Sequence, residues 1–101
     1  MHKGYSSELI AKKELIKEFG KENVIKVAIG GAQDYIILQR GRLKKVVEVK
    51  ECHQKKYCPS SHNKEQMLRM LNFCREHEVR LELWIHYPNQ KRWNKIIKYD
   101  L

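Results

Sequence analysis

Several features of other protein classes are scarce or missing in this 101-residue chain. Two prolines and three cysteines give neither a proline-rich linker nor a fully paired disulfide framework. The longest aliphatic or aromatic run, residues 35–38, is far shorter than the roughly 20 residues of a membrane-spanning helix. The first residues contain no apolar stretch typical of a signal peptide. These absences predict a cytoplasmic protein with free thiols and no membrane partner.

Acidic residues are also scarce. The chain has 12 acidic residues but 21 lysines and arginines, so its formal net charge is +9. In a small domain this balance points to a polyanionic partner, most often a nucleic acid, although a lysine-rich surface can also serve solubility alone. The length predicts one domain over residues 1–101, and a hydrophobic share of 42% is sufficient for a modest core.

The spacing of apolar residues predicts two helices and five strands. Ser6 or Ser7 is the expected N-cap of the first helix, and Gly20 is its expected stop. The first helix is expected to reach about residue 19, and the second to cover 63–77. The strands are expected at 24–29, 34–39, 43–50, 80–87 and 93–99. The order α-β-β-β-α-β-β favours an α+β domain with one central mixed sheet flanked by helices.

Two acids are expected to face each other in a hairpin. With Gly41 at the centre of the turn, paired residue numbers sum to 82, so Asp34 lies opposite Glu48, although a bulge would shift this register by one. Like charges at directly opposed positions destabilise a strand pair. A divalent cation between them removes this repulsion, and carboxylates are ligands that Mg²⁺ prefers.

A lysine shares the face of this acidic pair. Lys50 lies two residues beyond Glu48, and strand side chains alternate with period two. A cation at this place can lower the pKa of an attacking water and stabilise a pentavalent phosphate. By itself, the tripeptide at 48–50 is equally typical of an ordinary exposed strand with alternating charge.

The chain resembles the PD-(D/E)xK nuclease superfamily, and within it most closely the archaeal Holliday junction resolvases. The resemblance rests on an early acid, Glu8, four residues after a glycine, then Asp34 opening a strand, then Glu48-x-Lys50 ending the next strand. Lys26 is similar to a basic residue near the end of the family's first strand. The resemblance covers about residues 3–87. Gln33 stands where the superfamily name has proline, a departure that bears on junction selectivity more than on nuclease chemistry.

The resemblance implies a restriction-endonuclease-like core and a homodimeric, Mg²⁺-dependent endonuclease that hydrolyses DNA phosphodiesters, with Mn²⁺ as a possible substitute ion. The DNA would be branched or a four-way junction. Asp34, Glu48 and the backbone carbonyl of Val49 would hold the main metal ion. Glu8 would hold a second ion or an outer-shell water, and Lys50 would position the attacking water. The residues expected to contact DNA are Lys3, Lys26, Arg40, Arg42, Lys55 and Lys56.

Other interpretations of these residues stay open at the level of sequence. Glu8 near a helix N-terminus also complements the helix macrodipole. Gln66 resembles a glutamine that some members of the superfamily use, but it is expected to be a solvated helix position. The cysteines and histidines at 52, 53, 58, 62, 74 and 77 include pairs with zinc-ligand spacing. The two tryptophans, at 84 and 93, are expected to pack rather than stack on bases. The alternatives to the resolvase are a nuclease for duplex, flap or single-stranded DNA, a non-catalytic nucleic-acid-binding protein on the same fold, and a zinc-stabilised binding module.

Overall fold

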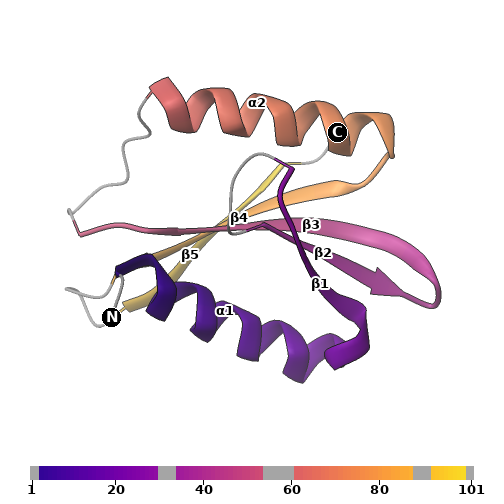
Figure 1. Ribbon diagram of the computed structural model, residues 1–101, viewed down its shortest axis with the longest axis horizontal. Helices are drawn as coiled ribbons and strands as arrows, with labels where there is room; N and C mark the ends of the chain where they lie inside the picture. Colours follow the sequence, from indigo (N-terminus) through magenta and orange to yellow (C-terminus); the bar gives the residue numbers. More distant parts are fainter. Residues whose placement is uncertain (1–2, 30–33, 54–60, 88–91, 100–101) are drawn as a thin grey trace.

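A five-stranded sheet lies between two helices, one on each face (Figure 1). The computed structural model describes residues 3–29, 34–53, 61–87 and 92–99. None of the helices within these ranges is long and apolar enough to cross a membrane. In chain order the elements are α1 (Lys3–Phe19), a 3₁₀ turn η1 (Lys21–Asn23), β1 (Val24–Val27), β2 (Asp34–Gln39), β3 (Arg42–Glu51), α2 (Ser61–Glu76), β4 (Arg80–Tyr87) and β5 (Arg92–Tyr99).

The strands are arranged in the order β1-β2-β3-β4-β5, and the sheet is mixed. Strands β1, β2 and β3 form an antiparallel meander, β4 runs parallel to β3, and β5 returns antiparallel to β4. Helix α2 is the crossover between the two parallel strands, as a parallel connection requires. The α+β class and the mixed sheet predicted from the sequence are therefore correct.

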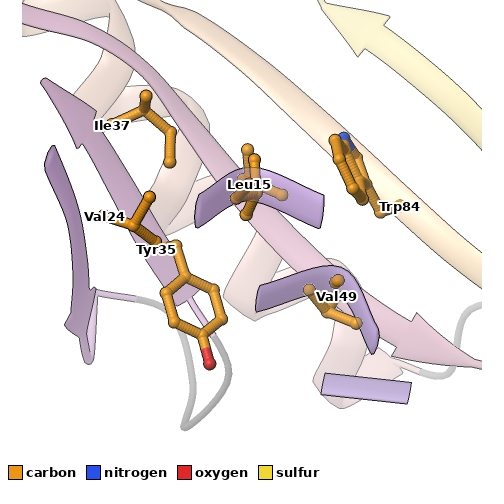
Figure 2. Packing of buried hydrophobic residues seen from close by; sticks show 8 residues of the cluster. Leu15, Val24, Tyr35, Ile37, Val49 and Trp84 are labelled. Carbon is orange, nitrogen blue, oxygen red and sulfur yellow. The ribbon is translucent and has the colours of Figure 1, made fainter. Parts of the chain in front are cut away.

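Helix α1 covers one face of the sheet with an apolar stripe. Ala11 and Leu15 are fully buried against side chains of β2, β3 and β4, including Tyr35, Val49 and Trp84 (Figure 2). These helix positions are four residues apart and therefore lie on one side of the helix. The helix ends at Phe19 because Gly20 adopts a φ of 92° and donates its N–H to the Ile16 carbonyl, as predicted for a glycine stop.

Helix α2 covers the opposite face. Met70 and Cys74, four residues apart, are fully buried against Val46 of β3 and Leu81 of β4. Because β-strand side chains alternate between faces, odd positions of β3 near its end face α1, whereas even positions face α2. This alternation decides on which side each polar residue of β3 lies.

The predicted start of the first helix is wrong. Helix α1 begins at Lys3, so Ser6 and Ser7 lie inside it and neither is an N-cap. The Ser7 hydroxyl instead donates to Glu51 Oε1 at 2.6 Å and lies 2.6 Å from His86 Nδ1. Ser7 thus makes a tertiary contact with β3 and β4 instead of capping the helix, which is the role that local propensity predicts.

Other boundaries differ by a few residues. The order of elements differs from the predicted one by an additional element, the 3₁₀ turn η1. Strand β1 ends at Val27 rather than residue 29, and β3 is longer than predicted at both ends. Helix α2 begins and ends slightly earlier than predicted, and β5 begins one residue earlier, whereas β2 and β4 have the predicted bounds.

Candidate functional site

The β2–β3 hairpin places Asp34 opposite Glu48, as predicted. Its turn consists of Arg40 and Gly41, whose φ values of 55° and 76° match the left-handed pair of a type I′ hairpin. Next to this turn the paired numbers sum to 81, as in Gln39 with Arg42, and beyond a bulge at Ile37/Leu38 they sum to 82. The extra residue of the bulge therefore restores the register that a turn centred on Gly41 had predicted.

The two acids occupy the closer of the two kinds of antiparallel pair. Cys52 donates its N–H to the His86 carbonyl at 2.8 Å, so the even-numbered residues of β3 turn their backbone groups toward β4. Glu48 is one of them, which makes Asp34–Glu48 a non-hydrogen-bonded pair across β2 and β3. In such pairs the Cα atoms are about 4.5 Å apart and the side chains are close. By the same alternation, the Val49 carbonyl points toward the β2 side.

Both carboxylates are buried, and each is only 1% exposed. Asp34 Oδ2 accepts the Ile29 N–H at 3.1 Å, and Glu48 Oε1 lies 3.1 Å from Lys50 Nζ. Within the described residues, Glu48 Oε2 accepts no hydrogen bond. Burial raises the pKa of Glu48, Lys50 lowers it in part, and the charge of Asp34 raises it further.

Lys50 connects this pair to helix α2. Its ammonium group donates to Gln66 Oε1 at 3.1 Å and lies at the same distance from Glu48 Oε1, while 22% of the side chain is exposed. Gln66 was expected to be a solvated helix position, and this expectation is wrong. The only signal for Gln66 in the sequence was its resemblance to a glutamine that some superfamily members use, because a lone glutamine on a polar helix turn has no pattern that identifies its partner.

Glu8 lies with a different set of side chains. Its Oε1 accepts the Tyr35 hydroxyl at 2.7 Å and lies 2.6 Å from Lys26 Nζ. Tyr35 and Lys26 are Cα partners on the face that α1 covers, whereas Asp34 and Glu48 project from the other face. Burial and the neighbouring Glu8 raise the pKa of Tyr35 well above its usual range. In the described part of the chain, no three His, Cys, Asp or Glu side chains are close enough to hold a metal ion.

The donor set of the acidic pair fits a hard divalent cation. The pair offers oxygen ligands from two opposed carboxylates and from the Val49 backbone carbonyl. One buried oxygen of Glu48 accepts no hydrogen bond within the described residues. Mg²⁺ is commonly bound through one or two carboxylates and keeps several waters. Asp34, Glu48 and the Val49 carbonyl can therefore hold such an ion without a third acid.

The predicted DNA-contacting residues whose side chains the structure describes, three of the six, lie away from this pair. Arg40 and Arg42 are exposed at the turn of the hairpin, which is the opposite end from Asp34. Lys26 is half-exposed and ion-paired to Glu8. Of Lys3 only the backbone is described, and Lys55 and Lys56 lie outside the described residues.

The zinc and base-stacking interpretations concern other residues. Cys74 is fully buried on α2, and burial raises the pKa of its thiol to about 11, which disfavours the thiolate that a zinc ion requires. Residue 58 and the side chain of residue 62 lie outside the described part of the chain. Trp84 is 5% exposed and donates its indole N–H to Glu82 at 2.9 Å, so it packs as expected.

Comparisons of the chain with protein-family models, with curated proteins and with solved structures gave no significant match.

Proposed function

We propose that this protein is a metal-dependent DNA endonuclease of the PD-(D/E)xK type. The observation that carries the proposal is the pair of fully buried carboxylates, Asp34 and Glu48, at directly opposed strand positions with the Lys50 ammonium 3.1 Å from one of them. A fold gains nothing from two buried like charges side by side. Such an arrangement is typical of a site that binds a cation.

The chemistry assigns a separate task to each group. Asp34, Glu48 and the Val49 carbonyl would hold Mg²⁺, with Mn²⁺ as a substitute. A bound divalent ion supplies a water of lowered pKa and positive charge for the phosphate. The Lys50 ammonium has three N–H donors, of which Gln66 accepts one and Glu48 lies at ion-pair distance. The remaining donor is available to orient an attacking water or a phosphate oxygen.

The substrate class follows from charge and from the family resemblance. A net charge of +9 favours a nucleic acid, because lysine and arginine contacts to phosphate supply most of the affinity of such proteins. The order of Glu8, Asp34, Glu48 and Lys50 resembles that of Holliday junction resolvases, which favours a four-way junction cut by a homodimer. The meander β1-β2-β3 followed by a parallel strand is compatible with the restriction-endonuclease-like core that this resemblance implies.

The test is a cleavage assay with Mg²⁺ on an end-labelled four-way junction, a matched duplex and a single strand. Asp34→Asn and Glu48→Gln remove the charge of the pair, and Glu22→Gln, an exposed acid on η1, is the matched control. We expect paired cuts on the junction by the wild type and by Glu22→Gln, and none by the two site variants.

Equal cleavage of every substrate would keep the nuclease and remove the junction preference. Wild-type rates in Glu48→Gln would refute the site. Tight DNA binding without any cleavage would replace the nuclease with a non-catalytic binding protein.

A further inference from the structure

The β2–β3 hairpin carries opposite charges at its two ends. Its open end holds the acids Asp34 and Glu48, and its turn holds Arg40, Arg42 and Lys44. Figure 1 shows this turn projecting beyond both helices. We call these three basic residues, 40, 42 and 44, the hairpin tip.

The basic side chains of the tip are available to a ligand. All three are exposed, and none forms a salt bridge with an acid of the described ranges. The next lysine behaves differently, because Lys45 is buried and ion-paired to Glu82 at 3.0 Å. The bulge beside the turn gives β3 one more residue than β2 there, so that Lys44 faces no residue of β2 in the register.

The distance from the tip to the acidic pair matches DNA geometry. Six residues of β3 separate Glu48 from Arg42, which at about 3.4 Å per residue amounts to about 20 Å. Duplex DNA rises about 3.4 Å per base pair, so this span covers about six base pairs, close to half a helical turn. One duplex arm can therefore contact both ends of the hairpin.

We propose that the hairpin tip is a second phosphate-binding surface for the DNA backbone, about 20 Å from the Asp34–Glu48 pair. This inference rests on the proposed function, because it takes the polyanion to be the DNA that the site cuts. The tip binds phosphates without reading bases, since contacts of basic side chains to phosphate carry no sequence information. It supplies affinity and leaves the chemistry at the other end of the hairpin unchanged.

The test removes three charges at the tip without disturbing the turn. The variant Arg40→Asn/Arg42→Gln/Lys44→Gln creates an Asn-Gly turn, which is the preferred type I′ sequence, so the hairpin keeps its register. The control Lys12→Gln/Lys13→Gln/Lys17→Gln removes the same charge from exposed positions on α1. Binding to a 20-base-pair duplex and to a four-way junction is measured in EDTA at several salt concentrations, with circular dichroism as the test of folding.

We expect the tip variant to bind at least tenfold more weakly at 0.1 M salt, with a slope of log K against log salt shallower by about 2 to 3. The α1 control is expected to keep the wild-type slope. Equal losses in the two variants would mean that net charge alone attracts DNA and would overturn the proposal.

The two proposals can fail separately. If the wild type cuts no DNA but the tip variant still loses affinity, the phosphate-binding surface stands and the nuclease proposal falls. If the wild type cuts DNA and the tip variant binds as tightly as the wild type, the tip proposal falls and the nuclease stands.

Discussion

Glu48 is a charge that the fold itself does not stabilise. It is buried beside a second acid, and within the described ranges Lys50, which also binds Gln66, is the cation at ion-pair distance from it. Its pKa is raised above the ordinary value of 4.5, chiefly by burial. The ionised form of Glu48 is therefore less favourable in the folded protein than in the unfolded chain.

This asymmetry predicts a pH-dependent gain in stability for Glu48→Gln in the absence of metal. A raised folded-state pKa gives stability that is fully present below about 4.5 and is lost as the pH rises through the raised value. The amide of the variant has no proton to lose and stays uncharged. At pH 8 the variant is therefore expected to be about 1 kcal/mol more stable than the wild type, with a Tm higher by about 4 °C. Near pH 4 the two proteins are expected to melt together.

Thermal melts in EDTA between pH 4 and pH 8 measure this difference. The exposed Glu22→Gln is the control and is expected to stay within 1 °C of the wild type at every pH, since surface changes of this kind have effects below about 0.5 kcal/mol. A Glu48→Gln variant whose gain in Tm over the wild type is no larger at pH 8 than at pH 4 would contradict the burial argument.

A second prediction at the residue scale concerns Gln66. Gln66→Ala removes an acceptor of the Lys50 ammonium and leaves the lysine more freedom to turn away from the site. A hydrogen bond to a charged group contributes about 1.5 kcal/mol, so we expect about tenfold slower single-turnover cleavage with unchanged DNA affinity. Asn72→Ala, an exposed position on the same helix, is the control. Equal rates for the two variants would remove Gln66 from the site.

Local sequence patterns could predict the acids, whereas Gln66 was a candidate only through the family resemblance. Asp34 and Glu48 follow from the period of a strand and the symmetry of a turn, which are local rules. Gln66 reaches Lys50 only because the crossover places α2 over the end of β3, and no local pattern encodes that placement.

At the scale of elements, the hairpin shows how a correct prediction can rest on an incomplete argument. The turn is centred between Arg40 and Gly41, so the pairing next to it is one residue away from the predicted register. The bulge at Ile37/Leu38 restores the predicted register before Asp34 is reached. From the sequence, a bulge was expected only to shift the predicted register by one residue, because a sequence does not show which residue of a strand stays unpaired.

Helix α1 is attached to the end of the sheet by a partly buried hydrogen-bonded chain. The Ser7 hydroxyl has one proton and gives it to Glu51 Oε1, so His86 Nδ1 must donate to Ser7 Oγ across the 2.6 Å contact. His53 Nε2 lies 2.8 Å from the other oxygen of Glu51. Residues from α1, β3 and β4 thus share one network.

Removing the serine is expected to weaken this attachment. Ser7 is 1% exposed, so Ser7→Ala leaves Glu51 and His86 without their shared partner, at a cost of about 1 to 3 kcal/mol and a Tm lower by about 5 °C or more. Thermal or urea unfolding at pH 7 measures the loss. Lys13→Ala, exposed on the same helix, is the control. A Ser7→Ala variant as stable as this control would mean that the network contributes nothing to the docking of α1.

At the scale of the whole molecule, the sheet separates groups that the sequence suggested belong together. By family resemblance, Glu8 was expected to hold a second ion or an outer-shell water beside the ion held by Asp34 and Glu48. In the structure the sheet lies between Glu8, which contacts Tyr35 and Lys26 on the α1 face, and the acidic pair on the α2 face. The class, the mixed sheet and the presence of the two helices and five strands followed from local patterns, but which face a helix residue reaches depends on packing of the entire chain.

The same separation predicts how many acids control metal binding. Among the described residues, Asp34 and Glu48 are the acids paired at one position on the α2 face, so Mg²⁺ is expected to stabilise the folded protein through these two residues and not through Glu8. An ion present at about ten times its Kd adds about 1.4 kcal/mol to the free energy of unfolding, which raises the Tm by about 5 °C.

Thermal melts at pH 8, with and without MgCl₂ at constant ionic strength, measure this shift. We expect the shift in the wild type and in Glu8→Gln, and its loss in Asp34→Asn and Glu48→Gln. A shift that survives in Glu48→Gln, or one abolished by Glu8→Gln alone, would show that the ion is held elsewhere, because a ligand stabilises the fold only through the groups that bind it.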